Sequence, residues 1–545
     1  MTSNGRRSIE KRRRDNINCP TDLIPALSKG MPALLLGAPV TAPEEFVLEI
    51  ARAVQPSAAF TDHGVTGLRT AHHGKRLVAS VHPITRETNV YPTIENLSSG
   101  KHLARLAAST AERIRDDRSL FPEDVTEVVP LSPVTLFGAH HKRGKARSRP
   151  AEYLSYVRFE RHVDGLAVYG PGSTALIGVG SDGTIRAFAH RWRPALGRVG
   201  TVSPHSRTAV RDAILDQLAP SAAVNNICVD RVTVGYFHAD GDLLQPVFRF
   251  EATVSSPDSK VVANRHLFGY VSIGAAPEPL PVLGVPRGND PVEPSRGKRP
   301  ARARAPRATV RAADPTVGRY VVRDDSPDWV SSANNFMSNL QAAQAWFGGI
   351  EFTDSQYYWA EPFEFLSDKN AFVNSVQVAL NEVHGNWWRF STRDNHDDIV
   401  DLTSIPAGGY GTSSGGSLAY WILHSCEVIP TQTDESTSFD VWWNIFDGLH
   451  AAVGYRTEMW IDDGVTGPFG FAIGLGAPVV STWITKVVGD SSYNPDATYT
   501  DSNRNITEPM GRPSAVAVHG HGDDTVADVD PLPAATSLSE WWISN

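Results

Sequence analysis

A histidine and a cysteine each follow an apolar stretch in the C-terminal half of the chain. The first stretch, Val376–Val383, leads into His384 and Gly385, and the second, Leu418–Leu423, leads to Cys426. Short apolar runs of this kind predict strands that are covered on both faces of a parallel sheet. Active sites of open parallel sheets lie at the carboxyl ends of their strands, so we expect both side chains at one edge.

Together these two side chains can carry out thiol catalysis. A thiolate is the nucleophile, and a neighbouring imidazole can take the thiol proton and later protonate a leaving amine. We therefore assign Cys426 as nucleophile and His384 as general acid/base. Gly385 allows a substrate carbonyl to approach the backbone closely. The N–H groups of Gly385 and Cys426 would then form an oxyanion hole.

Other side chains around this pair are candidates for a substrate pocket. His424 lies two residues before Cys426 and therefore on the same face of a strand. Asp462 and Asp463 are consecutive acidic residues, and an acidic pocket would favour an Arg or Lys side chain in the substrate. The five candidates for pocket residues are Trp387, His424, His450, Asp462 and Asp463.

A zinc site is the alternative chemistry for the same region. Imidazole and thiolate are both zinc ligands, and the ligands would be His384, His424, Cys426 and His450. The compact Cys-x-x-Cys spacing of zinc-binding motifs is absent, so we expect no metal and no other cofactor.

The elements that must position these residues alternate between helix and strand. Apolar residues at helical spacing predict a helix beginning near Ser326, with Trp329, Phe336 and Leu340 on its buried face. Helices that alternate with buried strands predict an α/β fold for residues 316–510.

The N-terminal half has a different pattern. Alternating strands joined by glycine-containing turns such as Asp182-Gly183, followed by a helix capped by Ser206, predict an α+β fold of antiparallel sheet plus helix. A segment rich in Pro, Arg and Ala separates the halves and predicts a disordered basic linker. The expected organisation is a disordered basic tail (1–38), an α+β N-terminal region (39–150), an α+β domain (151–276), the linker (277–315), the α/β domain (316–510) and an acidic C-terminal tail (511–545).

The composition is that of a globular protein, with 41% hydrophobic and 20% charged residues. A chain of 545 residues exceeds a single core, which predicts a multidomain protein. The net charge of −9 argues against a general nucleic-acid binder. No apolar run is long enough to span a bilayer. The basic N-terminus is not followed by a clear signal peptide, which predicts a cytoplasmic or non-classically exported protein.

Two resemblances extend these predictions. An apolar strand ending in His384-Gly385, then one ending in Ser425-Cys426, resembles the caspase-like cysteine peptidases, which include the gingipains, clostripain, legumain and separase. The resemblance implies a three-layer caspase-like α/β domain with His384 and Cys426 as the catalytic dyad. The hairpins of Val163–Gly172, with Asp182-Gly183 and Gln245–Phe250, resemble the PepSY-like and propeptide-type domains of bacterial peptidases. This second resemblance implies an inhibitory or chaperone-like module.

We therefore expect a thiol protease, a hydrolase that cleaves a protein or peptide through a Cys426 thioester. The N-terminal half would be its intramolecular partner. One alternative is a non-catalytic caspase-like protein that serves in binding or as a scaffold. The other is a structural assembly protein such as a viral coat subunit, whose basic arm would contact nucleic acid; nucleic acid is a partner only in that case.

Overall fold

The structure is a computed structural model of the chain. It describes residues 14–64, 66–222, 225–239, 241–255, 265–283, 288–296, 314–323, 328–347, 350–393, 398–405, 408–435, 438–461, 463–491 and 496–545. No helix in these ranges is both long and apolar enough to cross a membrane.

Short apolar runs form the parallel centre of the C-terminal half. Five strands pair in the order β18-β17-β19-β23-β24, all parallel. Their bounds are Thr353–Trp359 (β18), Thr316–Val321 (β17), Val378–Glu382 (β19), Tyr420–His424 (β23) and Ala451–Tyr455 (β24). Every residue of β19, β23 and β24 is buried, as expected for strands covered on both faces. The prediction that the runs before His384 and Cys426 are parallel strands is confirmed.

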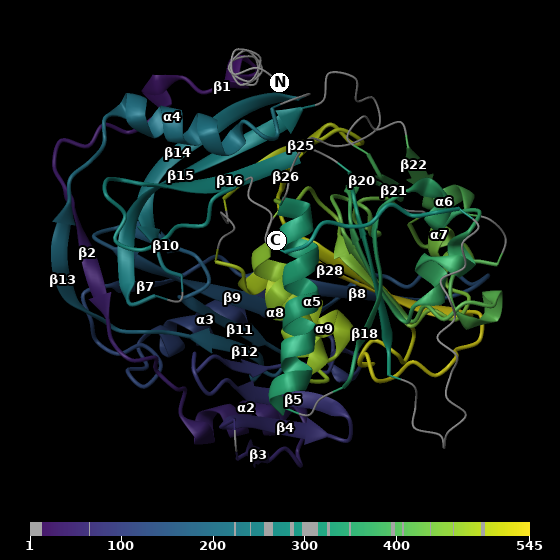
Figure 1. Cartoon of the computed structure of the whole chain (residues 1–545). Coiled ribbons are helices and arrows are strands. Elements are labelled where there is room, and N and C mark those ends of the chain that lie inside the picture. Colours follow the sequence, from purple (N-terminus) through teal and green to yellow (C-terminus); the bar gives the residue numbers. More distant parts are fainter. Residues whose placement is uncertain are drawn as a thin grey trace.

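Helices cover both faces of this parallel sheet. In Figure 1, α5, α8 and α9 lie on one side, and α6 and α7 lie on the other. The expected helix is α5, and Trp329, Phe336 and Leu340 are buried on it. The helices span Asp328–Phe347 (α5), Pro362–Phe365 (α6), Ser438–Ile445 (α7), Asp463–Gly474 (α8) and Val479–Gly489 (α9). The predicted α/β character of this half is confirmed.

The N-terminal half is dominated by antiparallel strands. The Asp182-Gly183 turn, in which Gly183 has a φ of +76°, joins two strands of one meander. Ser206 caps helix α4 (Arg207–Leu218) by accepting the Ala209 N–H. The strands of residues 151–276 are β9 (Ala151–Val163), β10 (Leu166–Tyr169), β11 (Thr174–Val179), β12 (Ile185–Arg191), β13 (Ala195–Val202), β14 (Asn226–Phe237), β15 (Leu243–Ser255) and β16 (Arg265–Ser272). The antiparallel sheet plus helix is confirmed.

Residues 39–150 add two helices and a run of short strands to the same half. The helices are α2 (Glu44–Val54) and α3 (Leu103–Arg115), and α3 packs on β9 and β11. The strands are β3 (Phe60–His63), β4 (Leu68–His73), β5 (Arg76–Val81), β6 (Thr88–Val90), β7 (Glu127–Pro130) and β8 (Val134–Lys142). The pairing of β6 with β12 joins this region to the meander.

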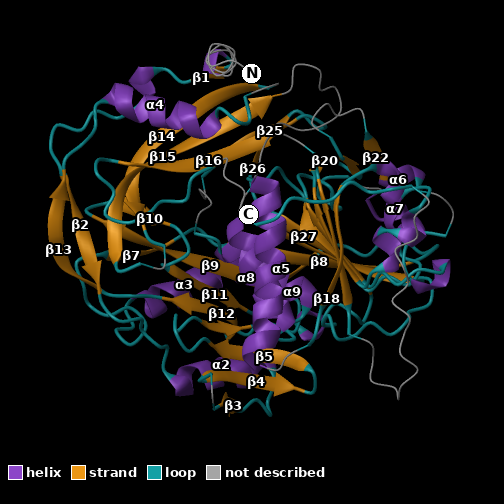
Figure 2. Cartoon of the chain, viewed as in Figure 1, coloured by secondary structure: helices purple, strands orange, loops and turns teal. Residues whose placement is uncertain are grey.

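The two halves share one continuous mixed sheet. Strand β28 (Ser537–Ser544) pairs with β27 (Pro513–Val518) on one side and with β8 on the other, and β27 pairs with β24. Figure 2 shows strands running across the molecule with helices packed against them. The expectation of an acidic tail over 511–545 is therefore wrong. The aspartates of this segment lie in the loop before β28, whereas Glu540, Trp541 and Trp542 are fully buried in the strand itself.

Residues 14–38 do not form the expected N-terminal tail. Residues 1–13 lie outside the described ranges, but β1 (Ile17–Asn18) pairs with β14, and β2 (Met31–Leu36) pairs with β13 and β15. The apolar run of β2 is long enough to add a strand to an existing sheet, and burying it outweighs the prolines and glycines around it. The prediction of disorder does not hold for residues 14–38.

The crowded arginines of the expected linker, within residues 297–313, lie outside the described residues. Residues 288–296 lie alongside strand β18. The Val292 N–H donates to the Tyr357 carbonyl at 3.0 Å, and the Trp359 N–H donates to the Val292 carbonyl at 3.1 Å. This part of 277–315 is therefore held against the C-terminal sheet and is not a free tether.

Two small antiparallel sheets complete the C-terminal half. They contain β20 (His384–Asn386), β21 (Arg389–Ser391) and β22 (Ile399–Asp401) in one, and β25 (Thr498–Asp501) and β26 (Ile506–Pro509) in the other. The first begins at His384, so the chain leaves the parallel sheet at the candidate histidine.

Candidate functional site

His384 and Cys426 follow adjacent parallel strands at the same edge of the sheet. Glu382, the last residue of β19, pairs with His424, the last residue of β23. His384 and Cys426 each lie two residues further along the chain. A Cβ added to Gly385 would lie 2.2 Å from both the Cys426 carbonyl oxygen and the Ser425 Oγ. Only glycine allows this approach, so the two chain segments are in direct backbone contact.

The Cys426 side chain is buried and held by the backbone of Met459. Its exposed fraction is 7%. The Met459 N–H donates to the sulfur at 3.4 Å, and the thiol donates to the Met459 carbonyl at 3.7 Å. Burial, and next the negative charge of Glu458, raise the pKa of the Cys426 thiol. In this conformation the sulfur is a protonated thiol and not a thiolate.

The His384 ring packs under helix α5. It is 2% exposed and meets the Trp329 ring edge to face, with 5.3 Å between centroids. The same tryptophan meets the His424 ring at 6.2 Å. Trp329 therefore contacts both imidazoles and fixes the plane of the candidate base.

Glu382 and His424 form a second, fully buried pair behind the dyad. His424 Nδ1 lies 2.6 Å from Glu382 Oε2, and neither side chain is exposed. The Ser332 hydroxyl donates to Glu382 Oε1 at 2.7 Å and lies 2.8 Å from the Thr466 hydroxyl. A buried charge is tolerated when it is paired and hydrogen-bonded in this way.

This pair corrects the expectation that His424 lines a substrate pocket. A side chain without exposed surface cannot touch a substrate, and His424 instead joins strands β19 and β23 to helices α5 and α8. In the sequence, the one indication of this buried pair is Glu382, a charged residue at the end of an otherwise mostly apolar run. The sequence does not reveal Ser332 and Thr466 as partners of Glu382, because serine and threonine residues in helices are common whether or not they bind a buried carboxylate.

Acidic groups collect beside Cys426, but not those expected. Asp462 and the side chain of Asp463 lie outside the described structure. Glu427, which has a φ of +49°, is buried and accepts the Tyr499 hydroxyl at 2.7 Å. Burial, and next the charge of Glu458, raise the pKa of Glu427 well above its usual range. Glu427 follows β23 and Glu458 follows β24, so both glutamates lie at the carboxyl ends of parallel strands.

The remaining pocket candidates lie in two different places. Trp387 follows β20, and the Arg504 guanidinium lies 5.7 Å from its ring. His450 lies beside Tyr420, the first residue of β23, with 5.4 Å between ring centroids. Because Cys426 follows the last residue of that strand, His450 is at the opposite edge of the sheet. The zinc alternative that combined His450 with Cys426 is therefore wrong.

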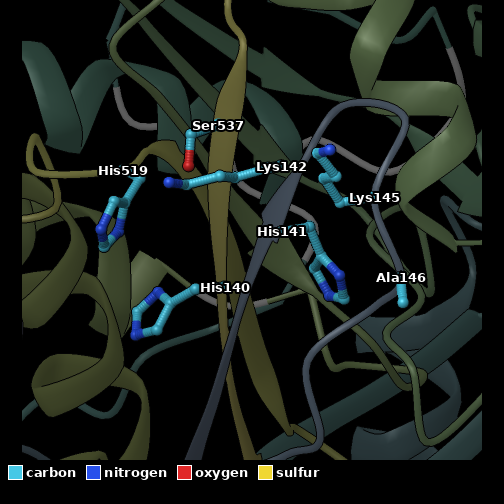
Figure 3. A pocket seen from close by; sticks show the side chains of 7 residues that line it. All are labelled: His140, His141, Lys142, Lys145, Ala146, His519 and Ser537. Carbon is cyan, nitrogen blue, oxygen red and sulfur yellow. The ribbon is translucent and has the colours of Figure 1, made fainter.

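A cavity of about 270 Å³ lies at the junction of β8 and β28, and no residue of the candidate dyad lines it. Figure 3 shows His140 and His519 together on one side of the paired strands and His141 with Lys145 on the other. His140 and His519 share the Ser539 hydroxyl, at 2.8 and 3.0 Å from their Nδ1 atoms. Burial lowers the pKa of His141 to about 4. The residues that line the cavity are His140, His141, Lys142, Lys145, Ala146, His519 and Ser537.

Comparison with known proteins identifies the C-terminal half as a recognised unit. Residues 316–545 match the family model "Domain of unknown function (DUF6345)". This range begins at β17 and ends with β28. A comparison with curated proteins finds no match.

One similar solved structure is that of an uncharacterized protein from Eubacterium rectale. It is 9% identical, with a TM-score of 0.27, and the alignment covers 48% of this chain and 87% of the other.

Proposed function

We propose that the chain is a latent cysteine peptidase with a caspase-like C-terminal domain, in which Cys426 is the nucleophile and His384 the general acid/base. The observation that carries the proposal is the parallel register of β19 and β23. It brings the His384-Gly385 and Ser425-Cys426 segments into backbone contact at one sheet edge. Thiol catalysis requires a nucleophile and a base close to each other, which two adjacent strand ends can supply.

In the proposed reaction, His384 accepts the Cys426 proton as the sulfur attacks the scissile carbonyl carbon. The S–C bond forms, the C–N bond breaks, and the imidazolium returns the proton to the leaving amine. Water then hydrolyses the thioester and restores the thiol. The N–H groups of Gly385 and Cys426 would stabilise the oxyanion, as backbone donors do in other acyl transfers.

Latency follows from the surroundings of the sulfur. A buried, protonated thiol is a poor nucleophile. The N-terminal half packs on the segment that holds it: His266 of β16 forms a bridge with Trp460 and contacts Glu458, and both flank Met459. These contacts support an inhibitory role for the N-terminal half, which must shift before Cys426 can meet a substrate.

A peptidyl acyloxymethyl ketone tests the dyad. We expect slow labelling of the intact chain at Cys426, mapped by mass spectrometry. His384→Ala should abolish the labelling, with circular dichroism to verify the fold. Cys228→Ser is the matched control, because Cys228 is exposed and lies in the N-terminal half. Equal labelling of Cys426 in the His384→Ala chain would contradict the proposal.

A second candidate is a non-catalytic scaffold that retains the caspase-like domain. The burial of Cys426 and its bonds to Met459 favour this candidate. It predicts no labelling of Cys426 under any condition that leaves the sheet folded. The same experiment therefore separates the two functions.

A further inference from the structure

Three ligand-type side chains converge at the sheet edge opposite Cys426. His450 precedes β24, and His521 and Asp524 belong to the loop between β27 and β28. The Asp524 Oδ2 lies 2.7 Å from His450 Nδ1 and 2.8 Å from His521 Nδ1. One ligand atom from each residue lies within 4.8 Å of the other two.

The hydrogen bond of His450 Nε2 determines whether Nδ1 carries a lone pair or a proton. Nε2 lies 2.9 Å from the Asp530 carbonyl oxygen, which can only accept, so Nε2 carries a proton. A neutral His450 therefore directs the lone pair of Nδ1 at a carboxylate oxygen. Either a proton, carried by the ring or by the carboxyl group, or a metal cation must therefore lie between these two atoms.

We propose that His450, His521 and Asp524 bind a divalent transition-metal ion, with Zn²⁺ as the best match. Two imidazoles and one carboxylate are a zinc ligand set, whereas calcium and magnesium select oxygen ligands. The carbonyl of Asp530 plays the part of the outer acceptor that orients a metal-binding histidine. The His450 side chain is 3% exposed and the His521 side chain is 35% exposed, so solvent reaches the proposed site from the side of His521.

Metal binding requires an adjustment of the three ligand atoms, which now lie within 4.8 Å of one another. Bonds of about 2.0–2.2 Å in a tetrahedral site separate ligand atoms by roughly 3.3 Å. Binding would widen the two contacts by about half an ångström, which the exposed loop residue His521 can supply.

The proposed metal would also fasten the two halves of the chain. The same loop holds Asp523, whose carboxylate accepts the Ile94 N–H at 2.7 Å and the Glu95 N–H at 3.2 Å. Glu95 in turn accepts the Gly520 and Gly522 N–H groups, at 3.3 and 3.1 Å. A metal that fixes this loop to β24 therefore stabilises contacts with the N-terminal half. This role is independent of any activity at Cys426.

Zinc titration of the tag-free full chain, after removal of metal with a chelator, tests the site. We expect one equivalent of Zn²⁺ to bind with a Kd of about 1 μM or tighter. His521→Ala should weaken binding at least about tenfold, and Asp524→Asn should do likewise. The matched control is His519→Ala in the same loop, because His519 contacts Ser539 and not Asp524.

Hydrogen exchange supplies a second readout. Zinc should slow exchange at the Gly520 and Gly522 amides in the wild-type and His519→Ala chains, and not in the His521→Ala chain. No zinc uptake at about 100 μM, or uptake that His521→Ala leaves unchanged, would overturn the proposal. The His450–Asp524 contact would then be an imidazolium–carboxylate pair.

Discussion

His266 of the N-terminal half contacts Glu458 of the C-terminal half, with 2.5 Å between Nε2 and Oε2. Glu458 precedes the residue whose backbone brackets the Cys426 sulfur, and its charge acts on the same thiol. A single contact between the halves is therefore coupled to the position and the protonation of the proposed nucleophile.

Glu458→Gln should make Cys426 more reactive. Removing this negative charge lowers the pKa of the buried thiol, because the charge opposes formation of the thiolate. We expect the rate of iodoacetamide labelling at pH 8 to rise by about three- to tenfold, which corresponds to a pKa change of up to about one unit.

The labelling of Cys228 in the same sample is the internal reference and should not change. Glu160→Gln, which removes another glutamate of low exposure from strand β9, is the matched variant and should leave Cys426 unaffected. An unchanged Cys426 rate in Glu458→Gln would show that access, and not charge, limits the reaction.

Trypsin cleavage between residues 296 and 314 should not separate the two halves. Strand β28 pairs along its whole length with β8 on one side, and it pairs with β27 on the other. We therefore expect the two fragments to elute together in size-exclusion chromatography and to separate only in denaturant. Separate elution in native buffer would contradict a continuous sheet.

Trp541→Ala should strongly destabilise this junction. The indole is fully buried, and a Cβ on Gly138 of β8 would lie 2.6 Å from its ring, so the two strands are in tight contact there. Loss of a buried tryptophan costs about 3–5 kcal/mol. Guanidinium unfolding measures the change, and Leu196→Ala, at a side chain that is 64% exposed, should change stability by less than about 0.5 kcal/mol.

The pair of Glu87 and Lys486 should give acid-dependent stability. Burial alone would raise the pKa of Glu87, but the charges of Lys486 and Arg191 overcome it and lower the pKa from 4.5 to about 2. The folded state thus binds this proton more weakly than the unfolded state does. Its stabilisation, up to about 3 kcal/mol, is complete above the unfolded pKa and is lost as the pH falls from 4.5 towards 2.

Lys486→Met tests this dependence. Urea unfolding midpoints at pH 6 and pH 3 should differ less in the variant than in the wild type, because the variant lacks the main charge that depresses the pKa. Glu112→Gln, in the exposed pair with Arg115, should leave the pH dependence unchanged. Equal pH dependence in Lys486→Met and wild type would contradict the assigned role.

Local patterns in the sequence were sufficient for the elements around the candidate dyad. The apolar runs before His384 and Cys426 predicted two buried parallel strands, because a strand covered on both faces has no polar alternation. The turn at Asp182-Gly183 and the cap at Ser206 were predicted for the same reason: each depends on backbone chemistry within a few residues.

The tertiary structure alone decided which of these residues meet. Strand β28 lies beside β8, about four hundred residues earlier in the chain, and this pairing leaves no periodic signal in either segment. The opposite positions of His450 and Cys426 depend on strand direction, which composition does not encode. The position and protonation of the Cys426 thiol depend on Met459 and Glu458, and the contact of Glu458 with His266 arises only when the two halves pack. Side-chain type and spacing determined the candidate chemistry, whereas burial and long-range contact determined its environment.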